Sequence, residues 1–345
     1  MRTEAMVIQR NGGPEVLERA EITLADPGPG EVRVRVRAVA LNHLDLWVRR
    51  GGAAFKLEFP HRLGSDMAGE IEALGSDVAG LTRGSRVMLH PAVSCGRCAA
   101  CLAGCDNLCR HYRILGENTQ GGYARHIVVP AVNVLPLGDA LEFPEAAALP
   151  LCTLTAWQMA FRKAGLEPGQ TVLVNAAGSG VSTMLIQIAK LVGARVIATT
   201  SQASKAERAR ALGADEVIVT SEQDLSVEVK RLTDRAGVDV AFDHVGAELF
   251  EKSLGVLRRG GKLVTCGATS GFEPRIDLRA VFFRQVEILG STMGRKSDLR
   301  QALPLLLSRR LRAVVDRVIP LWDARAAHEL LERRAAFGKV VLAVD

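Results

Sequence analysis

The residues best suited to chemistry in this chain of 345 residues are cysteines that lie between residues 95 and 109. This segment reads CGRCAACLAGCDNLC and holds five of the seven cysteines. Four of them are separated by two, two and seven residues, so a short loop can place four thiolates at the corners of a tetrahedron; they are Cys95, Cys98, Cys101 and Cys109. Zinc suits four soft ligands with no open position, and a closed site of this kind is structural. The alternative is a loop of free thiols, and Cys105 fits the spacing less well but could compete as a ligand.

A second segment with chemical potential is TVLVNAAGSGVSTMLIQIAKLVGARVIATT, residues 171 to 200. It opens with an apolar β-branched run, passes through a turn of small residues, and continues with apolar residues at helical spacing before a second apolar run. This pattern predicts a strand, a helix and a parallel strand, with glycines where the backbone approaches a pyrophosphate at a helix N-terminus. The predicted nucleotide contacts are Gly178, Ser179, Gly180 and Val181. Ser182 occupies the third glycine position of the usual pattern, and a simple helix-packing turn is the alternative.

The elements around these two segments differ in kind. In GEVRVRVRAVALN, Val32, Val34 and Val36 alternate with arginines, which predicts a half-exposed antiparallel strand in a β-rich first third. After residue 200, helices and strands alternate, which predicts a parallel, doubly wound sheet. We expect helices at 205–212, 225–233, 248–257 and 297–306, and strands at 216–219, 238–243, 262–266, 286–292 and 339–344.

Length and composition limit the function classes. The chain is too long for one ordinary core, and 48% hydrophobic with 24% charged residues is typical of a globular protein. We expect a cytoplasmic protein with no membrane partner, because no apolar segment spans a bilayer and the start MRTEAMVIQR lacks a signal-peptide core. The net charge is +6, but the arginine pairs are scattered and only 4% of residues are aromatic, so we expect no nucleic-acid partner.

Together these features resemble the medium-chain dehydrogenase/reductase superfamily, which contains zinc alcohol dehydrogenases and quinone oxidoreductases. The resemblance extends to NHLDLWVRRG (42–51), LGSDMAGEIEALG (63–75), GGYARHIVVPA (121–131) and AALPLCTLTAW (147–157). It implies an α/β protein with a GroES-like catalytic domain at 1–130, including a structural zinc lobe at about 91–112, and a Rossmann domain for NADP(H) at 131–290. Residues 291–345 would complete the sheet and return to the first domain. The resemblance also implies a small-molecule substrate and a homodimer or homotetramer.

The sequence departs from zinc alcohol dehydrogenases of this family at their catalytic metal. Those enzymes use a cysteine after the long strand, a histidine in a GHE motif, and a later cysteine or aspartate. Here Asn42 stands at the first position and Ser65 with Asp66 at the second, while Cys152 keeps a matching thiol. Because a catalytic zinc needs three protein ligands, it would need His43 or His61 as well, and we expect none to be bound.

The family resemblance also suggests the coenzyme and its contacts. The second Rossmann strand ends in ATTSQASK with no acidic residue, and Lys205 stands where related NADPH-dependent reductases place a phosphate-binding lysine. With Ser201 as a hydrogen-bond donor, this favours NADP(H) over NAD(H). Further coenzyme contacts implied by the resemblance are Thr155, Val245, Gly267 and Ala268.

The leading prediction is an NADPH-dependent reductase of quinones or α,β-unsaturated carbonyls, which need no Lewis acid to accept a hydride. Asn42, His43 and Asp45 are the predicted catalytic residues, with His43 or Asp45 relaying the proton. One alternative is a zinc-dependent alcohol dehydrogenase with an atypical metal shell. A second alternative is an NADPH-binding redox sensor in which Cys105 and the zinc loop respond to oxidation.

Overall fold

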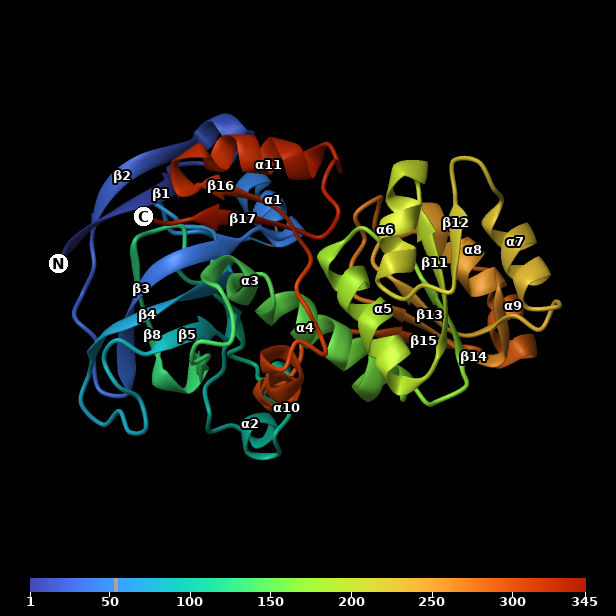
Figure 1. Ribbon diagram of the computed structural model, residues 1–345, viewed down its shortest axis with the longest axis horizontal. Coiled ribbons are helices and arrows are strands. Elements are labelled where there is room, and N and C mark those ends of the chain that lie inside the picture. The colour runs from blue at the N-terminus through green and yellow to red at the C-terminus, as the bar shows by residue number, and fades with distance from the viewer. Residues whose placement is uncertain (53–54) are drawn as a thin grey trace. The chain divides into compact units, whose positions relative to one another are not determined.

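The computed structural model describes residues 1–52 and 55–345, and the chain divides into two units. Unit 1 comprises Met1–Leu151 and Arg295–Asp345, and unit 2 comprises Cys152–Gly294 (Figure 1). These bounds differ from the expected divisions at residues 130 and 290. Residues 131–151 remain with unit 1 because β9 (Val134–Pro136) pairs with β5 (Arg86–Leu89) in the sheet of that unit.

Unit 1 is built on a seven-stranded sheet in the order β16-β17-β3-β4-β5-β9, with β8 also paired to β3. The central strand β3 (Glu31–Ala40) is the alternating segment, and Val32, Val34 and Val36 are buried as the pattern predicted. The other strands are β4 (Asp66–Leu74), β8 (His126–Pro130), β16 (Val315–Pro320) and β17 (Lys339–Ala343). β17 pairs antiparallel with β3, so this strand belongs to the sheet of unit 1, and the prediction that it would finish the doubly wound sheet is wrong.

Two small antiparallel sheets and a set of helices complete the described part of unit 1. The small sheets pair β1 (Arg2–Ile8) with β2 (Leu17–Thr23) and β6 (Ala92–Val93) with β7 (Arg113–Ile114). The helices are α1 (His43–Arg50), α2 (Ala99–Leu102), α3 (Phe143–Ala147), α10 (Lys296–Leu307) and α11 (Ala324–Glu332). Buried aliphatic residues from these elements form one core, in which α11 packs against β17 and α1. Neither α11 nor β16 was predicted.

Unit 2 is the doubly wound domain. Its six strands are all parallel in the order β12-β11-β10-β13-β14-β15, which confirms the predicted fold class. They are β10 (Thr171–Val174), β11 (Arg195–Thr200), β12 (Glu216–Val219), β13 (Val238–Asp243), β14 (Leu257–Thr265) and β15 (Glu287–Gly290). The order reverses between β10 and β13, and ligands of doubly wound sheets bind at such a switch point, outside the carboxyl ends of the strands.

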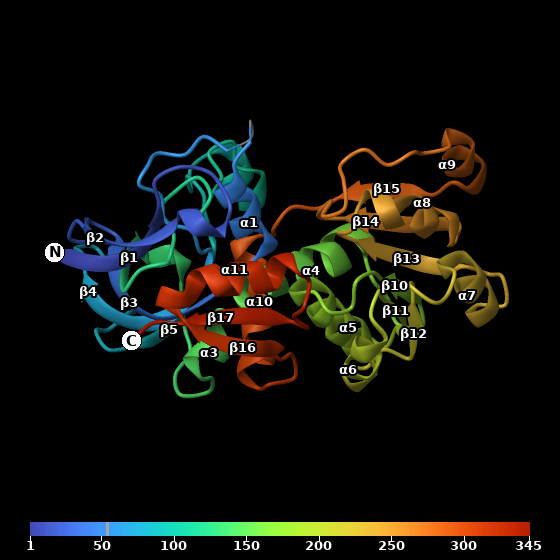
Figure 2. The same cartoon turned by 90° about the horizontal axis from the view of Figure 1, so that it is seen from above.

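Helices cover both faces of this sheet. In Figure 2, α5 (Gly180–Val192) and α6 (Ala206–Ala211) lie on one side, and α7 (Leu225–Leu232) and α8 (Ala247–Gly255) lie together on the other. The unit begins in α4 (Pro150–Trp157), which continues into a π-helical segment (Gln158–Ala164), and it also contains α9 (Leu278–Arg284), which was not predicted. Nowhere in residues 1–52 and 55–345 is a helix both long and apolar enough to cross a bilayer.

Candidate functional site

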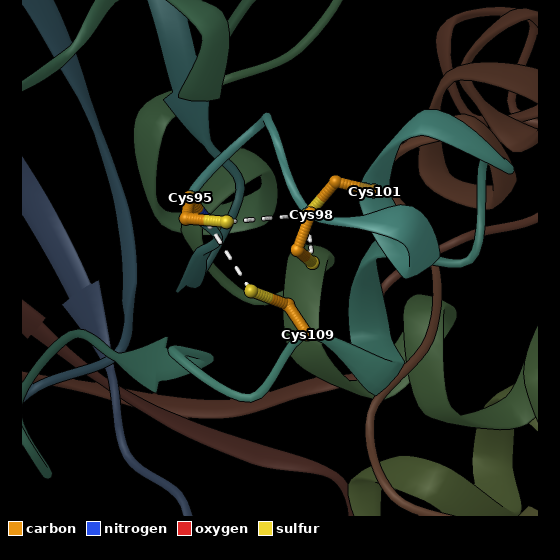
Figure 3. Close-up of side chains that lie close together, drawn as sticks. All are labelled: Cys95, Cys98, Cys101 and Cys109. Atoms are coloured by element: carbon orange, nitrogen blue, oxygen red, sulfur yellow. Dashed lines mark hydrogen bonds between the residues drawn. The ribbon is translucent and has the colours of Figure 1, made fainter.

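The four predicted zinc ligands converge in unit 1. Their sulfur atoms all lie within 4.8 Å of one another, and Figure 3 shows the side chains of Cys95, Cys98, Cys101 and Cys109 pointing toward a common centre. The Sγ atoms of Cys98 and Cys101 are 3.6 Å apart, and those of Cys95 and Cys101 are 4.0 Å apart. Four thiolates bound to one zinc at 2.3 Å stand about 3.8 Å apart, so this spacing fits a closed zinc site.

The surroundings of the thiols favour a bound cation. The backbone N–H groups of Arg97 and Cys98 lower the pKa of Cys95 to about 6, which favours its thiolate form. Burial and the neighbouring thiols raise the pKa of Cys101 to about 11, because an uncompensated second negative charge is unfavourable there. A divalent ion removes this conflict, and further backbone N–H groups, from Cys95 and His111, point at the Cys109 sulfur.

The cysteine loop is tied to the rest of unit 1 by a charged pair. Asp106 accepts hydrogen bonds from the backbone N–H of Lys296 (3.0 Å) and from its ammonium group (3.4 Å), and that ammonium also donates to Ser94 (2.8 Å). The loop is thereby anchored to the start of α10. Cys105 lies outside the thiol group, with its sulfur 3.8 Å from the carbonyl oxygen of Ala103. No other set of three or more His, Cys, Asp or Glu side chains in the described part of the chain is arranged to hold a metal.

The glycine turn has the form that a pyrophosphate requires. Ser179 is the N-cap of α5, and its hydroxyl accepts a hydrogen bond from the backbone N–H of Ser182 at 3.0 Å. The backbone N–H groups of Gly180 and Val181 have no intrahelical acceptor, since they belong to the first turn. No acceptor for them occurs within residues 1–52 and 55–345 either. Two free N–H groups at the positive end of a 13-residue helix fit an anionic group such as a coenzyme pyrophosphate.

Most other predicted coenzyme residues lie at the same edge of the sheet as this turn. They follow the carboxyl ends of parallel strands, with Ser201 and Lys205 after β11, Val245 after β13, and Gly267 and Ala268 after β14. Thr155 instead lies on α4, where it is buried. The edge is closely packed.

Gly246 shows how closely this edge is packed. Its backbone has φ of 86°, and an added Cβ would lie 2.6 Å from the carbonyl oxygen of Gly271. Only glycine allows the loop after β14 to approach the end of β13 so closely. The predicted phosphate turn and the predicted nicotinamide residues therefore lie at the same end of the sheet, where the carboxyl ends of its strands are.

A buried lysine lies among the residues that replace the catalytic metal ligands. The ammonium group of Lys339, at the start of β17, donates to Asn42 Oδ1 at 2.5 Å and to Asp66 Oδ2 at 2.9 Å. Asn42 Nδ2 also donates to Asp66 Oδ2, at 3.0 Å. Asp66 Oδ1 accepts the backbone N–H of Leu151. Lys339 is 5% exposed and Asp66 is fully buried, so this is a closed cluster of one cation, one anion and one amide.

This cluster does not fit a catalytic zinc. Such a zinc needs three protein ligands and an open position. The two side-chain oxygens that a metal would use at positions 42 and 66 are already bound by the Lys339 ammonium, whose charge repels a second cation. Ser65, at the position of the family's histidine, offers only a hydroxyl. His61 is directed elsewhere, with Nε2 3.1 Å from the carbonyl oxygen of Gly116.

Asp45 and His43 occupy the first turn of α1 next to this cluster. The Asp45 carboxylate is buried and accepts the backbone N–H groups of Asn42 (2.7 Å) and Gly64 (2.9 Å). Burial raises the pKa of Asp45 to about 6. Both of its oxygens are therefore occupied in holding the start of α1 to the loop before β4. His43 is the first residue of α1 and is half-buried, with its ring centroid 6.4 Å from that of Trp47.

The other end of α1 is held by a buried network. Arg49 Nη1 donates to His328 Nδ1 at 2.9 Å, and His328 Nε2 is 2.9 Å from the hydroxyl of Tyr123. Arg49 also pairs with Glu332 of α11. Burial lowers the pKa of His328 to about 3, so the ring is neutral and donates through Nε2. These contacts fix α1 against α11, and thereby fix the position of His43.

Sequence reasoning did not identify Lys339 or His328 as parts of this arrangement. For Lys339 a signal existed, because a single lysine opens the apolar run of β17, where a cation needs a buried partner. No helix was predicted over α11, so the sequence indicated no partner for His328. His244, which the sequence analysis did not single out, lies at the coenzyme edge after β13.

Two family models match this chain, one in its first part and one in its later part. Residues 28–139 match the alcohol dehydrogenase GroES-like domain, and residues 180–308 match the zinc-binding dehydrogenase family. A solved structure described as an NAD-dependent alcohol dehydrogenase has a TM-score of 0.96 and 51% identity, covering 100% of both chains. The NAD-dependent alcohol dehydrogenase of Sulfurisphaera tokodaii is 33% identical over 98% of this chain and 99% of the relative.

Quinone oxidoreductases also occur among the relatives. Quinone oxidoreductase 1 of Escherichia coli is 30% identical over 96% of this chain and 97% of its own length. The relatives are thus named as oxidoreductases, but for different substrates. This chain belongs to the medium-chain dehydrogenase/reductase superfamily and is an NAD(P)-dependent oxidoreductase of that type.

Proposed function

We propose that this protein is an NADPH-dependent reductase of quinones or α,β-unsaturated carbonyls that transfers a hydride without a catalytic metal. The observation that carries this proposal is the Lys339 ammonium, bound between Asn42 and Asp66 where zinc alcohol dehydrogenases of the family hold their metal. Alcohol oxidation needs a Lewis acid to stabilise an alkoxide, and the residues present do not supply its ligands.

Activated double bonds need less help from the protein. When bound, the coenzyme supplies a hydride, and the negative charge that arrives on a quinone or enone is delocalised onto an oxygen. The protein then has to orient the acceptor and provide one proton. A stabilising metal is not needed for this step, since the charge does not develop on an isolated alkoxide.

His43 is the residue that we assign to proton delivery. Asp45 is less suited, because both carboxylate oxygens already accept backbone N–H groups. The role that we assign to Asp45 is to hold the first turn of α1, on which His43 lies. Asn42 is likewise engaged by Lys339 and Asp66, and we assign it to the closed cluster rather than to the reacting atoms.

NADP(H) is the coenzyme we propose. β11 ends at Thr200, and the following residues Ser201 to Lys205 include no carboxylate that would repel a 2′-phosphate. Lys205 is half-buried at the end of a short 3₁₀ turn (Ala203–Lys205), four residues after the exposed Ser201. A cation and a hydroxyl in this loop suit a phosphate ester better than a ribose diol.

The proposal is tested with purified protein by following NADPH oxidation with 1,4-benzoquinone and with an enone, beside NADP+ reduction with primary and secondary alcohols. We expect turnover with the acceptors, none with the alcohols, and one zinc per chain by elemental analysis. Replacing Lys205 with alanine should weaken NADPH binding about tenfold and leave NADH binding nearly unchanged. Alcohol-dependent turnover with two zincs per chain would overturn the proposal.

A zinc-dependent alcohol dehydrogenase with an atypical metal shell is the second candidate, and the 51% identical alcohol dehydrogenase structure favours it. It requires Cys152 and Asp66 to act as ligands, and therefore requires Lys339 to leave Asp66. A redox sensor is a third candidate, supported only by Cys105, a half-buried thiol within the zinc loop that lies outside the four converging sulfurs. It predicts coenzyme binding without turnover and release of zinc by peroxide.

A further inference from the structure

His244 lies directly behind the glycine turn and contacts two of its serines. It follows β13, and its Nε2 atom is 2.8 Å from the hydroxyl of Ser179 and 2.9 Å from the hydroxyl of Ser182. Ser182 is fully buried, whereas Ser179 and His244 are half-buried at the edge of the sheet. One ring nitrogen therefore links the N-cap of α5 with the first turn of that helix.

The hydrogens in this network can be assigned by counting. The Ser182 hydroxyl donates its single hydrogen to the carbonyl oxygen of Asn175 at 2.6 Å, so it has none left for His244. Its contact with the ring is favourable only if Nε2 carries a hydrogen and donates it. Desolvation of the ring lowers the pKa of His244 to about 4, so the imidazole is neutral and Nδ1 is bare. His244 is then an Nε2–H donor shared between the two hydroxyl oxygens.

This assignment leaves the Ser179 hydrogen unused. Ser179 Oγ already accepts the backbone N–H of Ser182 and shares the Nε2–H of His244, so its oxygen acts as an acceptor on the inner side. Its own hydrogen must go to another acceptor. The nearest free donors beside it are the N–H groups of Gly180 and Val181 at the start of α5, so the three donors together suit an anion.

The backbone of His244 is connected to the other predicted part of the coenzyme site. Its carbonyl oxygen accepts the N–H of Thr269 at 3.3 Å, and the adjacent Val245 carbonyl accepts both the N–H and the hydroxyl of Ser270 at 2.7 Å. These bonds hold the loop after β14, which contains Gly267 and Ala268. His244 thus connects the phosphate turn to the loop predicted to lie at the nicotinamide.

We propose that His244 is a positioning residue for the coenzyme: as a neutral Nε2–H donor it makes the Ser179 hydroxyl a donor to a phosphate oxygen. The inference rests on the coenzyme binding at this turn, and it adds a residue that determines affinity for the pyrophosphate. It requires no particular substrate and holds for either nicotinamide coenzyme.

The test measures binding of two probes that differ only in the pyrophosphate. ADP and adenosine are titrated into the whole protein, by calorimetry for ADP and by ligand-observed NMR for adenosine. We expect His244→Leu and Ser179→Ala each to weaken ADP about tenfold or more, the range for a hydrogen bond to a charged group, with adenosine changed less than twofold. In the double variant the loss should be no larger than in Ser179→Ala, because His244 acts on ADP only through the Ser179 hydroxyl, which that variant already lacks.

His244→Gln retains an N–H near the position of Nε2 and should recover most of the ADP affinity. His126→Leu is a matched control for loss of a histidine, since this ring bonds to Thr3 in unit 1 (2.8 Å) and should leave ADP binding unchanged. Equal loss of ADP and adenosine would mean that His244 only supports the fold, and unchanged ADP affinity in His244→Leu would overturn its role. Failure of the unmodified protein to bind ADP would instead overturn the coenzyme site itself.

Discussion

The two places where this family holds zinc differ in the source of their positive charge. At the loop from Cys95 to Cys109, four thiols converge, and the charge that they need must come from outside the chain. At the second place, the chain supplies its own cation, because the Lys339 ammonium binds the oxygens of Asn42 and Asp66. The cysteine loop therefore offers four thiols to a metal, while the second place pairs its buried anion with a cation of the chain itself.

Removing the metal from the cysteine loop is the largest change we expect. Cys98→Ser should lower the zinc content from one per chain to near zero, because a closed four-thiolate site loses most of its affinity with one ligand. Since structural zinc binding is folding free energy, the variant should lose more than about 5 kcal/mol and lack an ordered loop. Elemental analysis and thermal unfolding measure both effects. Retention of one zinc in Cys98→Ser would show that other ligands hold it.

Opening the lysine cluster should have the next largest effect. Lys339→Met leaves Asp66 buried without its cation, which costs about 3 to 5 kcal/mol in similar buried pairs. Urea unfolding measures this loss. Adding Asp66→Asn should restore part of the stability, since the amide keeps an acceptor for the Leu151 N–H and removes the charge.

The zinc content should remain one per chain in both variants of the lysine cluster. A second zinc in Lys339→Met would mean that the lysine alone had kept a catalytic metal out. That result would favour the alcohol dehydrogenase candidate, because both places would then be able to hold zinc.

The cysteine loop and the lysine cluster also differ in how far the sequence could predict them. The cysteine spacing is local, so it predicted the convergence of Cys95, Cys98, Cys101 and Cys109, and the local βαβ pattern predicted β10 and α5. The lysine cluster joins residues 42, 66 and 339, and it exists only because β17 pairs with β3. Short apolar runs carry no information on which sheet they join. The role of His244 depends on hydrogen positions fixed by Ser179 and Ser182, which no pattern of residue types contains.

A smaller, pH-dependent effect tests the buried network of Arg49, His328 and Tyr123 that holds α1. The folded pKa of His328 is about 3, below its value of about 6.5 in an unfolded chain, so the unfolded state binds more protons. Stability should therefore fall as pH drops below about 6.5, with this residue contributing ~1.4 kcal/mol per pH unit. His328→Asn should be less stable at pH 7 but show a shallower dependence between pH 6 and 4, measured by urea unfolding. Equal slopes in the two proteins would contradict a buried neutral ring.

The smallest effect is expected at Cys105, and it separates the zinc ligands from the remaining thiol of the loop. Its sulfur contacts a carbonyl oxygen at 3.8 Å and lies outside the four converging sulfurs, so it contributes neither charge nor geometry to the metal. Cys105→Ser should keep one zinc per chain and change the free energy of unfolding by less than about 0.5 kcal/mol, as at most accessible positions. The same variant tested with peroxide distinguishes the sensor candidate, in which the serine would protect the zinc from release. If instead Cys105→Ser loses zinc without peroxide, Cys105 is a zinc ligand, and the set of four ligands given above is wrong.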